Sequence, residues 1–153
     1  MSLLKHVDRI AILSVLSVSL GLPAAALACS AASARSDRVA ARVALPGGGE
    51  SRFYTTGPAG TQTCRLDFSA AGEALGVAQV LTDGNFNRIN AGMSAAEVLA
   101  RIGPPHDKTR FARTATTAWD YHFADAWNYD SEFSVIFDDH DVVVGKFTER
   151  TGQ

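Results

Sequence analysis

The chain has 153 residues and a formal net charge of −2 at pH 7, from 14 basic and 16 acidic side chains. The basic residues form no stripe and do not alternate with aromatic residues, which argues against nucleic-acid binding and against electrostatic docking on anionic lipid. The length suits one domain with a core of its own.

Residues 1–28 have the layout of a secretory signal peptide. Lys5 and Arg9 give a weakly basic start, residues 10–22 are an uninterrupted run of apolar, Ser and Gly residues, and Pro23 ends this run. The run is shorter than the roughly 20 residues that a membrane-spanning helix needs. We therefore expect export, with cleavage after Ala28.

Cys29 directly follows the small-x-small residues 26–28 and resembles the cysteine of a bacterial lipobox. This resemblance implies lipid attachment at Cys29 and, from Ser30 after it, sorting to the outer membrane. Stable anchoring would need more than one acyl chain. The other cysteine is Cys64. The alternative is therefore ordinary cleavage, after which the two cysteines can form a disulfide in an oxidising periplasm. Cys64 can also stay a buried free thiol that behaves as a small hydrophobic residue.

Residues 29–51 are small, polar and rich in glycine. We interpret them as a flexible tether. The glycines at 47–49 have no strand before them and no helix after them, so they do not indicate a phosphate-binding loop.

Residues 52–81 are interpreted as a truncated β repeat. The segments FYTTG and CRLDFSAAGEALGV resemble the later WDYHF and FSVIFDDHDVVVG, with an alternating strand that ends in Phe68 or Phe137, a polar turn and a further strand. The upstream copy has no clear helical hairpin, which is why we expect it to be truncated.

A short helical hairpin is predicted next. Thr82 or Asp83 would cap the first helix. Ser94 and Glu97 form a capping box for the second helix, because each can satisfy a free backbone amide of the other. Gly103 and the two prolines after it end this helix. Its apolar stripe consists of Ala95, Val98, Leu99 and Ile102.

Three strands are predicted after the helices. Trp119, Tyr121 and Phe123 alternate with polar residues, residues 133–137 alternate in the same way, and DDHD at 138–141 makes a turn into residues 142–147. The simplest packing is a two-layer α+β fold, with the helical hairpin on one face of an antiparallel β-sheet in the order α-α-β-β-β and the truncated β repeat upstream.

The segment FNRINAGMSAAEVLARIGPP, followed by AWDYHF and FSVIFDDHDVVVGKF, resembles the SmpA/OmlA domain family of the outer-membrane β-barrel assembly factor BamE. The family pattern is I-x-x-G-M-[ST]-x-x-x-V-x-x-x-[LI]-G-x-P followed by W-x-Y. The resemblance places a BamE-like domain at residues 82–148. The matching positions are Ile89, Gly92, Met93, Ser94, Val98, Ile102, Gly103, Pro105, Trp119 and Tyr121.

The resemblance implies an outer-membrane-associated envelope lipoprotein on the periplasmic face, a non-catalytic scaffold or accessory in outer-membrane protein assembly and envelope integrity. Its partners would be envelope proteins, including a β-barrel assembly complex, and the membrane through a lipid anchor if Cys29 is acylated. No cofactor and no nucleic acid are implied. The alternative is a soluble periplasmic protein-binding or inhibitor module that resembles the β-lactamase-inhibitor proteins.

The residues themselves also indicate a protein without an active site. His106, His122 and His140 show no metal-ligand spacing, and no serine lies in a nucleophile elbow. The DDHD run at 138–141 is interpreted as a polar hairpin turn rather than a cation site. We expect no catalytic residue and no metal.

Trp127 and Tyr129 lie in the otherwise polar segment ADAWNYDSE. Exposed aromatic residues flanked by charge are typical of interface anchors, so we predict that these two residues bind a partner. The alternative is that the two rings fold back and cover the end of the sheet.

Overall fold

The structure is a computed structural model that describes residue 29, residues 39–56 and residues 60–151. The predicted signal peptide at 1–28 lies outside the described residues. No helix in the described ranges combines the length and the apolar character needed to cross a membrane.

The first sheet contains four antiparallel strands in sequential order, β1 (Ala41–Ala44), β2 (Glu50–Thr56), β3 (Gln62–Phe68) and β4 (Ala74–Gln79). The β1–β2 turn is closed by hydrogen bonds between Leu45 and the glycines, from the Leu45 amide to the Gly49 carbonyl at 2.8 Å and from the Gly48 amide to the Leu45 carbonyl at 3.2 Å. Gly47 and Gly48 both have positive φ, which glycine adopts without steric cost.

The second sheet is also a sequential antiparallel meander, β5 (Asp107–Phe111), β6 (Thr116–Ala124), β7 (Asp130–Phe137) and β8 (Val143–Arg150). Trp119 pairs with Val135 and Tyr121 with Phe133 across β6 and β7. The predicted alternation is confirmed, because the aromatic residues of β6 are buried and Asp120 and His122 between them are not.

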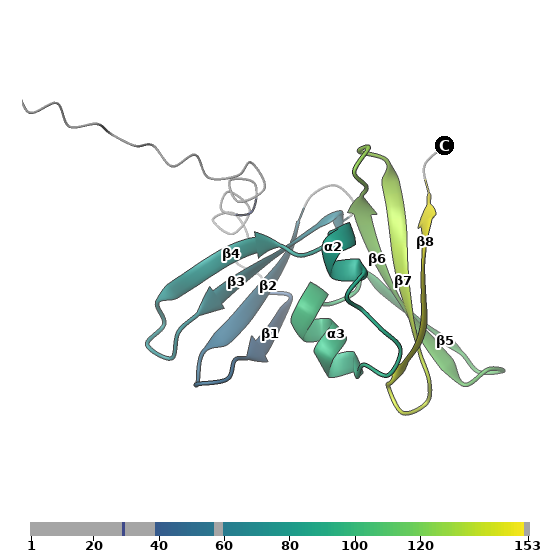
Figure 1. Cartoon of the computed structure of the whole chain (residues 1–153), viewed down its shortest axis with the longest axis horizontal. Coiled ribbons are helices and arrows are strands. Elements are labelled where there is room, and N and C mark those ends of the chain that lie inside the picture. Colours follow the sequence, from purple (N-terminus) through teal and green to yellow (C-terminus); the bar gives the residue numbers. More distant parts are fainter. Residues whose placement is uncertain (1–28, 30–38, 57–59, 152–153) are drawn as a thin grey trace, which may run out of the picture.

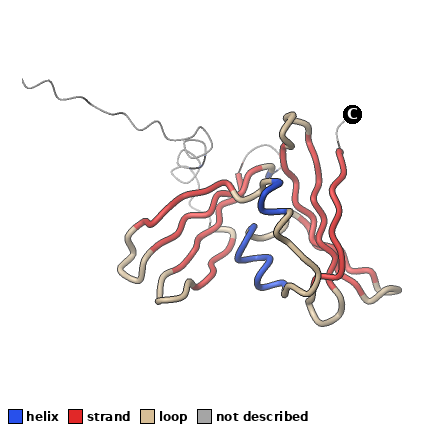
Figure 2. The backbone as a smooth tube through the Cα atoms, in the orientation of Figure 1, coloured by secondary structure: helices blue, strands red, loops and turns tan. Residues whose placement is uncertain are grey.

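Two short helices, α2 (Asp83–Phe86) and α3 (Ala95–Ile102), connect the sheets and lie between them (Figures 1 and 2). Thr82 caps α2 by accepting from the Asn85 amide. The predicted capping box of α3 is confirmed, since both hydrogen bonds between Ser94 and Glu97 are present.

The main core lies between the helices and the second sheet. Phe86 of α2 stacks on Phe133 with ring centroids 4.1 Å apart and meets Phe123 edge to face at 4.8 Å. The buried core residues are Leu81, Phe86, Ile89, Val98, Ile102, Trp119, Tyr121, Phe123, Phe133, Val135, Phe137 and Val143. Leu99 of the predicted apolar stripe and Met93 are partly buried and pack against this core.

The opposite side of the helical layer meets the first sheet at Gly103. A β-carbon at Gly103 would lie 2.7 Å from Phe53 Cδ1 and 3.0 Å from Thr63 Cγ2. The carbonyl of Gly103 accepts a hydrogen bond from the buried Tyr121 hydroxyl at 3.2 Å. The end of α3 therefore contacts both sheets at once.

The prediction of a two-layer α+β fold with a helical hairpin on one sheet is wrong. The part of the chain that the structure describes is mostly β, with two four-stranded antiparallel sheets and with α2 and α3, of four and eight residues, between them. The segment predicted as a truncated β repeat forms most of a separate four-stranded sheet, in which β1 also takes part. The sequence pattern placed both helices, but it led us to expect that they make up half of the fold.

The predicted tether at 29–51 and the predicted boundary at residue 52 need correction as well. Strand β1 and the first residues of β2 lie inside the tether range. The two strands pair with each other, with Ala41 opposite Phe53 and Ala44 opposite Glu50. From residue 41 on, the small and glycine-rich residues that suggested a tether form the short strand β1 and the hairpin turn after it. Strand β5 was not predicted, because all of its side chains are exposed and show no apolar alternation.

The two sheets share one irregularity. The register shifts between Asp67 and Phe68 in the first sheet and between Ile136 and Phe137 in the second. Phe68 and Phe137 are the residues that the sequence comparison of the two halves placed in equivalent positions. In each sheet, one residue near the start of the fourth strand, Leu75 in β4 and Val144 in β8, is passed over in the pairing with the end of the third strand.

Candidate protein-binding surface

The loop between β6 and β7, residues 125–129, is held in one shape by the side chain of Asp125. Asp125 Oδ1 accepts from the Trp127 amide at 2.8 Å and from the Tyr129 amide at 2.9 Å. Asn128 adopts a φ of 62°, a left-handed conformation that Asn tolerates better than most residues. The loop is thus closed locally by an aspartate that hydrogen-bonds the backbone after it.

Arg150 fixes the same loop from the end of β8. Its Nε donates to Asp125 Oδ2 at 3.0 Å, and its guanidinium carbon lies 4.7 Å from the centre of the Tyr129 ring. The amide hydrogen bonds from Tyr129 and Trp127 and the Arg150 ion pair outweigh the effect of burial, and together they lower the pKa of Asp125 below its ordinary value. The carboxylate is therefore ionised at neutral pH.

Trp127 and Tyr129 are exposed on this loop, with 76% and 51% of their surface accessible. The alternative that both rings fold back over the sheet is wrong for Trp127. The Arg150 guanidinium packs over the Tyr129 ring, but half of the Tyr129 surface remains accessible to solvent. Large aromatic side chains with this exposure on a rigid loop are what an interface anchor requires.

Two shallow recesses lie beside the aromatic loop. One, of about 320 Å³, is lined by Trp127 together with Asp83, Asp125, Glu149 and Arg150. The other, of about 280 Å³, lies between the same loop and the start of β3, and shares Asp83 and Asp125 with the first. Three carboxylates and one guanidinium give the first recess an acidic character.

Asp125 and Arg150 were not among the predicted site residues. The sequence D-x-W-N-Y carries a local signal for Asp125, because an aspartate two residues before a backbone amide favours this type of turn. Arg150 has no such signal. It reaches the loop only because Ser131 of β7 pairs with Arg150 of β8.

Cys29, the predicted lipid-attachment residue, forms a disulfide with Cys64 of β3. The disulfide is one of the states that the sequence leaves open, and it differs from the buried free thiol expected for Cys64. One sulfur atom cannot hold both the disulfide and a thioether-linked lipid, so the two states exclude each other. Both cysteines are buried. Lipid attachment stays a prediction.

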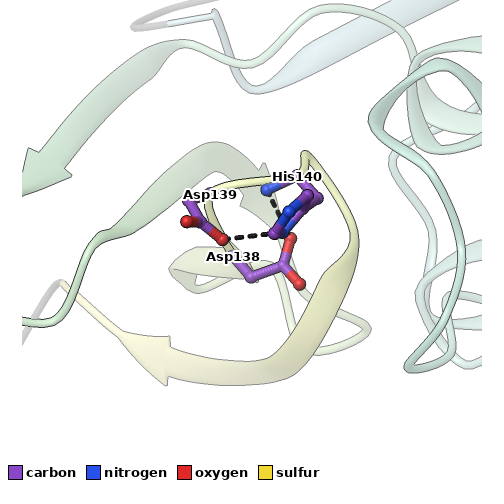
Figure 3. A group of neighbouring side chains, drawn as sticks. All are labelled: Asp138, Asp139 and His140. Carbon is purple, nitrogen blue, oxygen red and sulfur yellow. Dashed lines mark hydrogen bonds and ion pairs between the residues drawn. The ribbon is translucent and has the colours of Figure 1, made fainter.

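The DDHD run forms the β7–β8 turn, as predicted. Asp138, Asp139 and His140 lie close together there (Figure 3). Asp138 Oδ1 accepts from the amides of His140 and Val142, each at 2.9 Å, and Asp139 Oδ1 lies 2.7 Å from His140 Nδ1. Contacts of this kind, in which an aspartate accepts from the backbone amides after it, are typical of a tight turn.

His106 and His122 meet on the face of the second sheet that points away from the helices. His106 stacks on His122 at 4.2 Å, and His122 Nε2 lies 3.0 Å from Glu132 Oε2. The hydroxyl of Ser134 donates to Asp120 at 2.7 Å rather than to a histidine. No nucleophile therefore faces a histidine base among these residues.

Comparison of the chain with protein-family models, with curated proteins and with solved structures gives no match. The resemblance to the BamE-like domain family consequently stays a prediction from the sequence motif.

Proposed function

We propose that this chain is an exported, non-catalytic protein-binding module of the bacterial cell envelope, and that the loop at residues 125–129 captures its partner. The observation that carries the proposal is Trp127, a large apolar side chain that is 76% exposed on a loop fixed by Asp125 and Arg150. Because the loop is already ordered, binding would cost little conformational entropy.

The side chains around Trp127 indicate which kind of partner surface would fit this loop. The Trp127 ring fits an apolar pocket, and the carboxylates of Asp83 and Glu149 beside it favour a basic rim around that pocket. We therefore propose a protein partner with an apolar pocket bordered by lysine or arginine side chains.

The disulfide between Cys29 and Cys64 favours a diffusible form of the module in the periplasm. The second candidate function is a lipid-anchored accessory in outer-membrane protein assembly. It is favoured by the position of Cys29 after residues 26–28 and by the motif at 89–105 with Trp119 and Tyr121. Both candidates use the same partner-binding loop, and they differ in the anchor and in the class of partner.

Photo-crosslinking in the native host tests the loop. A photoreactive phenylalanine analogue at position 127 should crosslink a specific envelope protein. The same analogue at Arg113, which is exposed in the β5–β6 turn, is the matched control and should not give that product. Replacing Tyr129 with Ala should weaken the crosslink at position 127, while the thermal melt of the protein changes little.

The proposal fails if positions 127 and 113 give the same products, or if the Trp127→Ala variant retains full partner capture. A Trp127→Ala variant that no longer folds would instead assign the ring a structural role. A crosslink to a component of the β-barrel assembly machinery would favour the second candidate.

A further inference from the structure

A cleft of about 480 Å³ lies between the first sheet and the helices, apart from the aromatic loop. Three arginines from different elements line it: Arg65 of β3, Arg88 just after α2 and Arg101 in the last turn of α3. Ala78 and Ala100 leave room between them. Its volume falls in the range of small-molecule sites in proteins.

Two of these arginines have buried donors without a hydrogen-bond partner. Among the described residues, Arg65 Nε and Arg101 Nε are the buried side-chain nitrogens or oxygens left unpaired. Arg65 Nε lies 3.2 Å from Asp67 Oδ1, an ion-pair distance, but the angle does not suit a hydrogen bond. Because buried polar groups in folded proteins nearly always have a partner, these unpaired donors need an explanation.

The arginines of the cleft outnumber the carboxylates beside them, even though Arg65 is paired with Asp67 at 3.2 Å. Glu97 is the only acidic residue of the lining, against three arginines. The Glu97 carboxylate is already engaged, since its Oε2 accepts from the Ser94 amide and hydroxyl, both at 2.8 Å. The cleft is therefore cationic in a chain whose overall charge is negative.

We propose that this cleft binds the phosphate or carboxylate group of a small molecule. Guanidinium groups donate paired hydrogen bonds that match both oxyanions, and the lining of the cleft supplies three of them against one carboxylate. The site is separate from the aromatic loop, so it does not depend on the proposed function.

The direct test is an amide chemical-shift titration with inorganic phosphate and with citrate, at constant ionic strength set by chloride. We expect saturable shifts centred on residues 65, 88 and 101. The Arg101→Gln variant should weaken binding about tenfold or more, because it removes charged hydrogen bonds. Arg113→Gln, at an exposed turn, should bind like the wild-type protein, and so should Trp127→Ala.

Folding of the variants is checked by thermal melting. Phosphate should raise the Tm of the wild-type protein, because it binds the folded state, and should raise that of Arg101→Gln clearly less. Arg65→Lys keeps the positive charge but loses the planar guanidinium with its paired donors. Its affinity for phosphate should lie between that of the wild-type protein and that of Arg101→Gln. Absence of saturable shifts at millimolar phosphate, or equal losses in Arg113→Gln and Arg101→Gln, would overturn the proposal.

Vesicle cosedimentation distinguishes the source of the oxyanion. The probes are phosphatidylcholine vesicles with and without phosphatidic acid. Binding that requires phosphatidic acid and is lost in Arg101→Gln assigns the cleft to a lipid headgroup. Binding of free phosphate without vesicle binding assigns it to a soluble ligand.

Discussion

Gly103 joins the two halves of the molecule because no larger residue fits there. Its φ of +80° is a left-handed conformation, and a β-carbon would lie 2.7 Å from the Phe53 ring. We expect Gly103→Ala to lower the free energy of unfolding by about 1–3 kcal/mol, from backbone strain and from the displaced ring. Urea denaturation measures this difference.

Gly145 is the matched control for Gly103. A β-carbon at Gly145 has no neighbour within 4 Å, and the residue lies in an extended strand. Gly145→Ala should therefore leave the free energy of unfolding nearly unchanged. Equal effects at the two positions would show that the contact between Gly103 and the first sheet is not as close as the structure has it.

Asp125 makes the aromatic loop sensitive to acid. Its pKa is lower in the folded state than the ordinary value of 3.8. A depressed carboxyl pKa contributes stability that is fully present above about pH 5 and is lost as the pH falls through the folded pKa. We expect the difference in stability between the wild-type protein and Asp125→Asn to shrink steadily below that pH.

The measurement is chemical denaturation at a series of pH values from neutral to acid. Hydrogen exchange of the Tyr129 amide should accelerate over the same range relative to its intrinsic rate, since this amide donates to Asp125. A stability difference that stays constant down to the lowest pH would contradict the assigned role of the carboxylate.

The sequence indicates only part of this site. Trp127 and Tyr129 could be selected from the sequence because aromatic residues in a polar segment fit neither a strand face nor a helix stripe. Arg150 could not, because it reaches Asp125 only through the pairing of β7 with β8. The cleft arginines were not predicted either, since Arg65, Arg88 and Arg101 are far apart in the sequence and come together only when α3 lies against the first sheet.

At the scale of elements, two of the three hairpin turns of the second sheet, β6–β7 and β7–β8, are closed by the same kind of aspartate contact. Asp125 accepts from the amides two and four residues later, and Asp138 does the same with His140 and Val142. These amide hydrogen bonds lower the pKa of Asp138 as well, most strongly the one from Val142. The aspartates thus fix the turns that set the register of β6, β7 and β8.

Helix α3 depends on its capping box, because eight residues are too few for a helix to be stable on its own. The Ser94 hydroxyl accepts from the Glu97 amide at 3.3 Å. We expect Ser94→Ala to lower the free energy of unfolding by about 1 kcal/mol. Ser94→Thr, which keeps the acceptor, should retain most of the stability in the same urea titration. An Ala variant as stable as the Thr variant would argue against the cap.

Elements with a clear pattern could be predicted, and those without one could not. The capping box specified the start of α3, and the alternating aromatic residues specified β6 and β7. Strand β1 has small residues and β5 has only exposed ones, so neither shows the apolar periodicity that marks a half-buried strand. Their pairing with longer neighbours, not their own composition, makes them strands.

At the scale of the whole molecule, the sequence pattern predicted one layer too few. The apolar stripe of α3, with Val98 and Ile102, faces the second sheet. Its other side carries Ala100 and Arg101 toward the first sheet. A helix side made of small and charged residues looks solvent-exposed in a sequence, so the contact with a second sheet could not be seen.

The disulfide ties residue 29 to the middle of the first sheet, closing a separation of 35 residues. Reduction should lower the free energy of unfolding by about 2–4 kcal/mol, because it frees this loop in the unfolded chain. Urea denaturation with and without a reducing agent measures the effect. The double variant Cys29→Ser/Cys64→Ser should not respond to the reducing agent, and a wild-type protein that also fails to respond would contradict the disulfide.

We propose above that the chain works as a diffusible, disulfide-bonded binding module of the periplasm. Intact mass spectrometry of the mature protein from the native host, without reduction, is the measurement to make first. We expect an unacylated chain whose mass is lower than that of the reduced form by the hydrogens lost when Cys29 and Cys64 pair. An acylated N-terminal peptide beginning at Cys29, with Cys64 as a free thiol, would contradict it and favour the lipid-anchored accessory.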